Sequence, residues 1–459
     1  MNVSRRSFLA GAASSLAAPR LTMAQSSGDG FRPVVARRSE ASLLEQGART
    51  PVWMFGDGAE PPVIPAVQGE ELKLRFSNEL DREIWLHFFG VRGPSELMTI
   101  NVSPGAAQAV DCVFTPPDAG TFWIGPVADA SRVRDMGLYA MLVVAEAGAP
   151  AGFADLPVIL DDWKLDDNGA IADDFGDMEA MVGEGRLGNW FTVNSRYRPR
   201  LMLQAGTYTR LRLLNAANVR TMSLLFKGHD PVLVGLDGQP VKPRPLDSKS
   251  LLLAPGQRAD LLASPVDGDI TLALDLFEDV VELAYLARQG ESAAPSLDPN
   301  FMLPANPVAV PGPGGALRSI PIVIEGGIKG GLKSARLGGE VLDLRSLLER
   351  GKGWAINGTA GPAPEPMFTA DRDEKLVLAI DNRTAFAQPV HIHGHVWQEV
   401  TSDGETDAPL RDTAVIGPGR TINLALVADN PGTWAIQSLV AERADGGLIA
   451  AFKVAEGAL

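Results

Sequence analysis

Short apolar runs separated by turns that contain Gly, Pro and Asp recur along most of the chain. Runs dominated by Val, Leu, Ile, Phe and Thr and bounded by such turns are typical of β-strands. The clearest candidates are Leu72–Phe76, Ala140–Val144, Leu156–Leu160, Tyr208–Leu214, Ser223–Phe226, Leu251–Leu253, Ile270–Leu274, Ile320–Ile324, Leu376–Ile380 and Ile422–Leu426. Helical periodicity is sparse, and Glu340–Arg350 is the best candidate for a short helix. The pattern therefore predicts an all-β protein built from sandwiches or barrels.

Two similar stretches of sequence suggest how the strands are grouped. Gly120-Thr121-Phe122-Trp123 precedes Leu142-Val143-Val144, and Gly432-Thr433-Trp434 precedes Phe452-Lys453-Val454. Each stretch describes a strand, a turn and a closing strand, as expected of repeated Greek-key sandwiches. We therefore expect units at residues 40–147, 148–290 and 316–459, with the proline-rich segment 291–315 as a linker.

Composition narrows the function classes. The 459 residues carry a formal net charge of −15, and such an acidic chain is not expected to bind nucleic acid. Cys112 is the single cysteine, so an intramolecular disulfide is excluded. Outside the N-terminus the sequence has no apolar run of the roughly 18–20 residues that a membrane span needs, so we expect none.

The N-terminus has the pattern of an export signal. Ser4-Arg5-Arg6-Ser7-Phe8-Leu9 resembles the twin-arginine signature, and an apolar stretch runs from Leu9 to Ala18. Thr22-Met23-Ala24 supplies small residues before a cleavage point. We expect residues 1–24 to be a twin-arginine signal peptide and the mature protein to be periplasmic.

Two motifs near the C-terminus suggest a family. Pro389-Val390-His391-Ile392-His393-Gly394-His395 resembles the H-P-x-H-L-H-G-H signature of multicopper oxidases, and Trp434-Ala435-Ile436-Gln437-Ser438-Leu439 lies where that family has W-x-x-H-C-H. Further phrases match the family in order, among them Arg212-Leu213-Leu214-Asn215, Asp237-Gly238-Gln239-Pro240, Pro255-Gly256-Gln257-Arg258 and Arg411-Asp412-Thr413. This resemblance implies three consecutive cupredoxin-like Greek-key β-sandwich domains.

The same comparison implies that most copper ligands are missing. A complete copper set in this family uses ten histidines and one cysteine, whereas this chain has five histidines and one cysteine in total. At the blue-copper (type 1) site, which receives electrons, the ligand positions hold Gln388, Ser438, Arg443 and Leu448. Serine is a poor ligand for a soft metal, and Arg443 places a cation where a metal cation would bind. A four-electron, oxygen-reducing oxidase is therefore excluded.

The trinuclear copper site is depleted unevenly. The resemblance places non-ligands at five of its eight histidine positions, namely Phe89, Gly125, Val127, Gln437 and Leu439. Three ligand positions keep their histidines, which are His87, His391 and His393. His229 and His395 match family histidines that are not ligands, and we expect both to be structural.

Three functions remain open. The chain could be a non-catalytic binding or scaffold protein of the cell envelope with an envelope protein as partner, and this interpretation, which requires no cofactor, is favoured. Alternatively, His87, His391 and His393 could bind a single copper or zinc ion in an oxidoreductase or metal carrier, although no carboxylate that would orient them is identifiable from sequence. Thirdly, Phe89, Val127 and Leu439 could line an apolar pocket for a small molecule.

Overall fold

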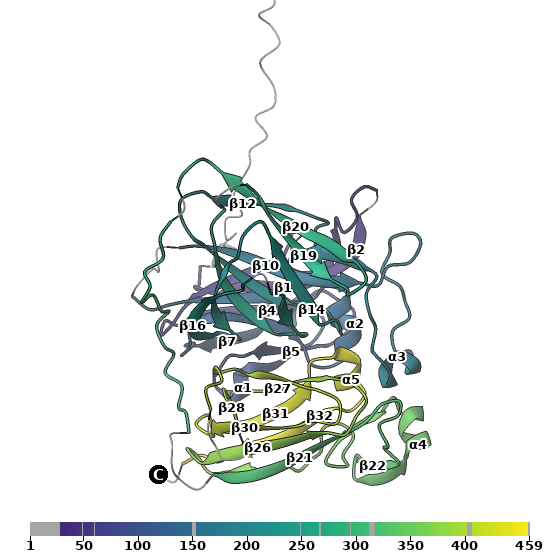
Figure 1. The fold of residues 1–459 in the computed structure, drawn as a ribbon. Coiled ribbons are helices and arrows are strands. Elements are labelled where there is room, and N and C mark those ends of the chain that lie inside the picture. The colour runs from purple at the N-terminus through teal and green to yellow at the C-terminus, as the bar shows by residue number, and fades with distance from the viewer. Residues whose placement is uncertain are drawn as a thin grey trace, which may run out of the picture.

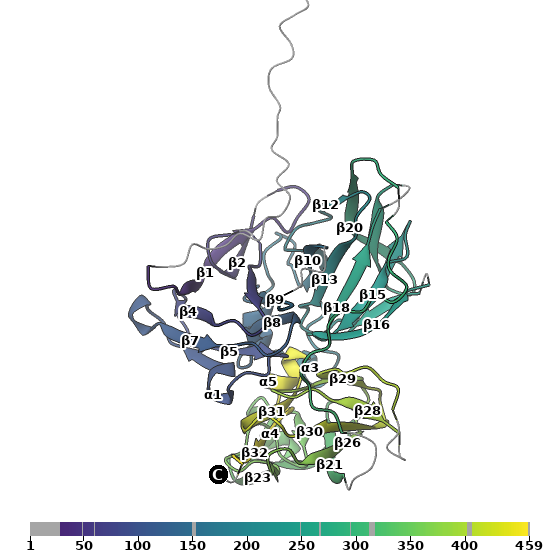
Figure 2. The ribbon, with the colours of Figure 1, turned by 90° about the vertical axis from the view of Figure 1, so that its left-hand side faces the viewer.

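The computed structural model describes residues 28–47, 49–58, 60–148, 153–247, 249–265, 268–293, 295–311, 317–401 and 406–457. The expected signal peptide at residues 1–24 lies outside these ranges. The regular secondary structure of the described chain is mostly β, as predicted, and is arranged as successive two-sheet sandwiches (Figures 1 and 2). All ten strand candidates from the sequence coincide with strands, except that the first residue of one candidate, Tyr208, precedes its strand by one position.

The first sandwich packs a four-stranded sheet, ordered β2-β1-β4-β7, against a five-stranded sheet, ordered β3-β9-β8-β5-β6. Its strands are β1 (Arg32–Ala41), β2 (Thr50–Phe55), β3 (Val63–Val67), β4 (Leu72–Asn78), β5 (Ile84–Phe89), β6 (Thr99–Val102), β7 (Val110–Phe114), β8 (Gly120–Pro126) and β9 (Ala140–Ala145). Two short α-helices, α1 (Ser95–Met98) and α2 (Ala130–Asp135), and a 3-10 turn (Ala106–Gln108) connect them.

The middle sandwich has sheets ordered β11-β10-β13-β18-β15-β16 and β12-β20-β19-β14-β17. Its strands are β10 (Ala154–Trp163), β11 (Trp190–Val193), β12 (Arg200–Gln204), β13 (Thr209–Asn215), β14 (Met222–Lys227), β15 (Val232–Leu236), β16 (Gln239–Pro245), β17 (Leu251–Leu253), β18 (Arg258–Ala263), β19 (Ile270–Asp275) and β20 (Val280–Gln289). The short helix α3 (Met178–Val182) lies in the long β10–β11 connection.

The third sandwich has sheets ordered β24-β21-β26-β30-β28 and β25-β32-β31-β27-β29, with a β22–β23 hairpin at its edge. Its strands are β21 (Arg318–Gly326), β22 (Ser334–Leu337), β23 (Glu340–Asp343), β24 (Trp354–Ile356), β25 (Thr369–Ala370), β26 (Lys375–Asn382), β27 (Gln388–Ile392), β28 (Gln398–Val400), β29 (Thr413–Ile416), β30 (Thr421–Val427), β31 (Gly432–Ser438) and β32 (Ile449–Val454). Its helices are α4 (Leu344–Glu349) and α5 (Ala441–Asp445).

The three sandwiches repeat one topology. In each, the first long strand runs parallel to a later strand, and that strand pairs antiparallel with a third: β1 with β4 and β7, β10 with β13 and β18, and β21 with β26 and β30. Such non-sequential pairing is the mark of a Greek-key arrangement. The repeated topology agrees with the cupredoxin-like architecture that the resemblance implied.

The sequence prediction was partly wrong at Glu340–Arg350, where only the second half is helical. Val341 and Leu342 pair with the preceding strand as β23, and the helix begins at Leu344. The side chain of Asp343 accepts a hydrogen bond from Ser346 N and so caps that helix. Strand pairing in the β22–β23 hairpin therefore prevails over helix propensity at Glu340–Asp343.

The apolar cores show how the sandwiches are joined. One continuous core cluster contains residues of both the first and the third sandwich, while the middle sandwich has a cluster of its own. The described part of segment 291–315 has no helix or strand, and Asn306 ties it to the first two sandwiches by hydrogen bonds to Ala119 O and Gly238 O. The exact domain limits of the sequence analysis stay predictions.

None of the helices within the described ranges is long and apolar enough to cross a membrane.

Candidate functional site

The three retained histidines meet where the first sandwich contacts the third. His87 lies in β5, His391 lies in β27, and His393 follows the end of β27. All three are at most 3% exposed, and each offers a nitrogen that lies within 4.8 Å of those of the others. The ring centroids of His87 and His393 are 3.8 Å apart, and those of His391 and His393 are 5.0 Å apart. The structure therefore brings together the residues that the sequence singled out.

Strand pairing places two of the retained histidines opposite family ligand positions that lack a histidine in this chain. His87 lies directly opposite Gly125 in the β5–β8 pair, and His391 lies directly opposite Gln437 in the β27–β31 pair. A Cβ at Gly125 would lie 2.0 Å from a ring carbon of Trp123. The Trp123 indole thus occupies the space that a histidine at position 125 would need.

The Nδ1 atoms of His87 and His391 lie close to oxygen atoms of neighbouring side chains. His87 Nδ1 lies 2.8 Å from Thr99 Oγ1. His391 Nδ1 lies 3.1 Å from Thr413 Oγ1 and 3.3 Å from Asp412 Oδ1. By contrast, the Nε2 atoms of all three histidines are buried and have no hydrogen-bond partner among the described residues. Buried polar atoms without a partner are uncommon in folded proteins and call for a ligand or an ordered water.

Hydrogen-bond directions fix the tautomer of His391. Thr413 Oγ1 donates its hydrogen to Asp412 Oδ1 at 2.8 Å. Both oxygens near His391 Nδ1 are therefore acceptors, so Nδ1 carries a proton. Nε2 is thus the nitrogen of His391 that is left to bind a metal ion.

Burial keeps the imidazoles of His87 and His393 neutral. It lowers the pKa of His87 and that of His393 well below the usual value, and neighbouring imidazoles lower both further. Three imidazoles with converging nitrogens are a ligand set that zinc and copper accept. The residues present fit one metal ion, which His87, His391 and His393 would hold; when bound, such an ion would supply Lewis-acid or redox chemistry.

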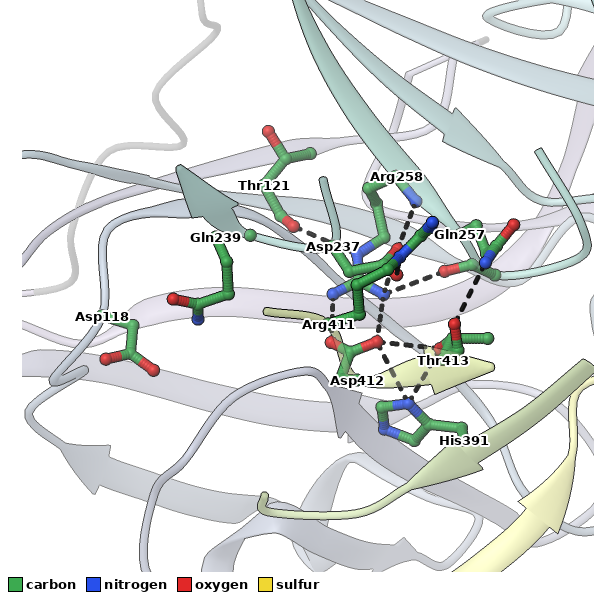
Figure 3. A network of polar contacts seen from close by, with 12 residues as sticks. Asp118, Thr121, Asp237, Gln239, Gln257, Arg258, His391, Arg411, Asp412 and Thr413 are labelled. Carbon is green, nitrogen blue, oxygen red and sulfur yellow. Dashed lines mark hydrogen bonds and ion pairs between the residues drawn. The ribbon is translucent and has the colours of Figure 1, made fainter. Parts of the chain in front are cut away.

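A carboxylate that orients His391 was not identified from the sequence, and the structure supplies one in Asp412. Arg258 Nη2 donates to Asp412 Oδ2 at 2.5 Å, and Arg411 Nε donates to Asp237 Oδ2 at 2.7 Å (Figure 3). Burial would raise the pKa of Asp412, but Arg258 and His391 hold it below its usual value. The Arg411-Asp412-Thr413 phrase was the available signal, since Thr413 lies opposite His391 in the β27–β29 pair.

The apolar substitutions form packed core rather than an open pocket. Phe89 stacks on Trp123 with centroids 4.1 Å apart and planes at 9°. Phe89 and Leu439 are fully buried in one apolar cluster, and Val127 packs against it. The small-molecule pocket expected from these three residues therefore gains no support from the structure.

At the type 1 position a buried cation takes the place of a metal. Arg443 Nη1 donates to Ala387 O at 2.7 Å and to Gln388 Oε1 at 3.1 Å. The guanidinium carbon lies 5.1 Å from the Trp354 ring centroid and 4.9 Å from that of Phe386. Burial lowers the pKa of Arg443 to about 10, so it still carries a positive charge near neutral pH.

The two other histidines lie apart from the convergent group. His395 is buried, and its Nδ1 lies 3.0 Å from the carbonyl oxygen of His393. Burial lowers the pKa of His395 to about 4. His229 lies in the middle sandwich after β14 and is half-buried. Their structural role stays a prediction.

Three sequence models described as multicopper oxidase domains match residues 37–148, 155–269 and 340–458. The chain belongs to the multicopper oxidase family. A crystal structure of a multicopper oxidase from Pseudomonas thermotolerans is similar, with a TM-score of 0.77, 30% identity and coverage of 93% of this chain and 99% of that one. These matches confirm the family that the sequence motifs suggested.

Two curated relatives bear different names. The multicopper oxidase MmcO of Mycobacterium tuberculosis is 26% identical over 94% of this chain and 92% of its own length. The cell division protein FtsP of Escherichia coli is also 26% identical, over 59% of this chain and 62% of its own length. Similarity to proteins of both kinds leaves the activity to be decided by the residues of the site.

Proposed function

We propose that this chain is a non-catalytic binding protein of the bacterial cell envelope that has kept the multicopper oxidase fold without its oxidase activity. The observation that carries the proposal is the contact of Arg443 with Gln388 at the type 1 position. A hydrogen-bonded guanidinium beside two aromatic rings stands at the position where the family's electron-entry copper would bind. A cation there repels a metal ion, and neither partner offers a thiolate.

The location and the kind of function are supported by the sequence and by the relatives. The twin-arginine pattern at Arg5 and Arg6 supports export to the periplasm. Similarity to the cell division protein FtsP makes cell division the first process to examine for such a binding protein. The partner itself stays open.

Oxygen uptake after incubation with excess copper tests the loss of oxidase activity. We expect no uptake with phenolic or metal-ion substrates beyond that of a copper-only control, and no absorbance band near 600 nm, roughly where a thiolate-bound blue copper absorbs. Oxygen uptake by the wild type that exceeds the copper-only control and is lost in Arg443→Ala would overturn the proposal. Fractionation of cells with Arg5→Lys/Arg6→Lys tests the export: the variant should stay in the cytoplasm.

A second candidate function is binding of a single copper or zinc ion by the convergent histidines, as a metal carrier or a metal-dependent enzyme. The observation that favours it is the set of three buried Nε2 atoms without partners within the described residues. Catalytic zinc sites with three protein ligands keep a further position for water, and here the packed rings of Phe89 and Trp123 would have to move to provide one.

Metal content measured after dialysis tests this candidate. We expect one equivalent of copper or zinc, and we expect His391→Ala to lose it. His229→Ala is the matched control because this histidine lies outside the convergent group. Retention of metal by His391→Ala, or equal loss in both variants, would assign the metal to adventitious sites.

A further inference from the structure

The middle sandwich exposes an aromatic side chain at the tip of the β19–β20 hairpin. Phe277 is 98% exposed and has a backbone φ of 71°. A bulky residue rarely adopts this left-handed conformation, because its side chain crowds the backbone. Asp275 Oδ1 accepts a hydrogen bond from Phe277 N at 2.9 Å, and Leu276 N donates to Asp279 O at 2.8 Å. The turn thus holds Phe277 outward at a position that Asn or Gly would occupy with less strain.

Acidic residues lie next to Phe277 in the sequence of the turn. Asp275, Glu278 and Asp279 flank it in the sequence, and the turn carries no basic residue. A large exposed apolar side chain with a polar rim is the usual form of an anchor at a protein interface. The negative rim disfavours insertion into an anionic lipid surface and favours a pocket that carries positive charge.

A cavity with matching properties lies at the other end of the same sheet. It has a volume of about 280 Å³, and its lining includes Leu225, Phe226, Leu246, Lys227, Lys249 and Asp230. Apolar side chains and two lysines therefore meet in one opening, with one acidic residue among them. The volume exceeds the roughly 150 Å³ of a protein cavity that holds a benzene ring, so one aromatic side chain has room to enter.

Strand register places the tip and the cavity at opposite ends of the sheet. β14 and β19 are antiparallel, with Lys227 opposite Thr271 and Leu224 opposite Leu274. The cavity adjoins the Lys227 end of this pair, whereas Phe277 lies beyond the Leu274 end. Two copies that lie antiparallel along this sheet could therefore make the same contact twice.

We propose that Phe277 of one copy inserts into this cavity of a second copy, forming a dimer with two equivalent contacts. The acidic rim of the tip then faces Lys227 and Lys249 of the partner copy. In a dimer with twofold symmetry, each Phe277 side chain occupies the cavity of the other copy. No tip or cavity is then left to bind a third copy. The contact goes beyond the proposed function and requires neither a metal ion nor an envelope partner.

Sedimentation velocity of the purified protein from micromolar to near-millimolar concentration tests the dimer. We expect the mass to approach twice that of the monomer, and Phe277→Asn to weaken association at least about tenfold. Asparagine tolerates positive φ, so this variant should fold normally. Val341→Asn is the matched control, because it removes another well-exposed apolar side chain, in the third sandwich, and should leave the mass unchanged.

A mixing experiment tests whether tip and cavity are the two halves of the contact. Lys227→Glu/Lys249→Glu should be monomeric on its own, as should Phe277→Asn. In an equimolar mixture, the intact tip of the lysine variant and the intact cavity of Phe277→Asn can make one complete contact, so the mixture should associate more tightly than either variant alone. The proposal is overturned if the wild type stays monomeric throughout, if Phe277→Asn dimerises like the wild type, or if the mixture associates no more tightly than the separate variants.

Discussion

Arg443 donates a hydrogen bond from α5 to Gln388 in β27, so two residues at former type 1 ligand positions now bind each other. The other two positions are equally committed to the fold. Ser438 Oγ accepts a hydrogen bond from Val440 N at 3.1 Å, and Leu448 is fully buried in the core. In this chain the residues at these family positions are therefore part of the structural core of the third sandwich.

The hydrogen bonds and ring contacts of Arg443 predict that this residue stabilises the protein. Arg443→Ala removes the hydrogen-bond donor to Ala387 O and Gln388 Oε1, and it leaves a cavity beside the rings of Trp354 and Phe386. We expect a loss of about 2–4 kcal/mol in the free energy of unfolding, measured by urea denaturation. Arg383→Ala, which removes an exposed ion pair with Asp381, should have a far smaller effect. Equal effects in both variants would contradict a structural role for Arg443.

Asp412 links the histidine site to the interface between the middle and third sandwiches. Asp412→Asn leaves the guanidinium of Arg258, which is fully buried, with a weakened partner. Breaking a buried ion pair costs about 3–5 kcal/mol, so we expect a loss near that range in urea denaturation. The variant also weakens the anchoring of His391, so metal affinity, if the site binds metal, should fall about 10- to 100-fold in a competition titration. Unchanged stability would contradict this role of Asp412.

The fold was predictable from local pattern, and the site only in part. Strand positions follow from apolar runs between turns, which each segment carries in its own sequence. His391 and His393 could be placed together because residues two apart in a strand share a face. His87 joins them only through packing of the first sandwich on the third, so the family motifs were needed to include it. The partners Asp412 and Arg258, and the placement of Trp123 beside Gly125, depend on tertiary contacts that no local pattern encodes.

Asp445 predicts a pH dependence of stability at the contact between α2 and α5. Its carboxylate accepts hydrogen bonds from Ala130 N at 3.0 Å and Ser131 N at 2.9 Å. Burial nevertheless raises the pKa of Asp445 to about 6, from 3.8. The folded state therefore binds this proton more tightly than the unfolded state, and stability from this group is lost as pH rises from about 4 to 6.

Urea denaturation at pH 4 and pH 7 measures this effect against Asp445→Asn, which cannot titrate. The stability of the wild type minus that of the variant should be greater at pH 4 than at pH 7, by up to about 3 kcal/mol for a shift of about two pH units. Other groups titrate alike in both proteins and cancel in the difference. A difference that is constant with pH would show that folding leaves the pKa of Asp445 unchanged, and one that grows toward pH 7 would show that folding lowers it; either result would contradict the prediction.

Phe89 provides a test of whether the histidines are relics or ligands. Its ring centroid lies 5.0 Å from that of His87, and it stacks on Trp123. Phe89→Ala should lose about 3–5 kcal/mol of stability because it leaves a cavity in a packed cluster. That cavity lies beside the three histidine rings and could admit water as a further metal ligand. Copper or zinc should therefore raise the melting temperature of Phe89→Ala more than that of Phe89→Leu, which keeps most of the volume. A metal that saturates the site at a hundredfold excess over its dissociation constant would restore about 2.7 kcal/mol. Equal melting temperatures with and without metal in both variants would favour the interpretation of His87, His391 and His393 as buried relics, and would leave the binding-protein proposal intact.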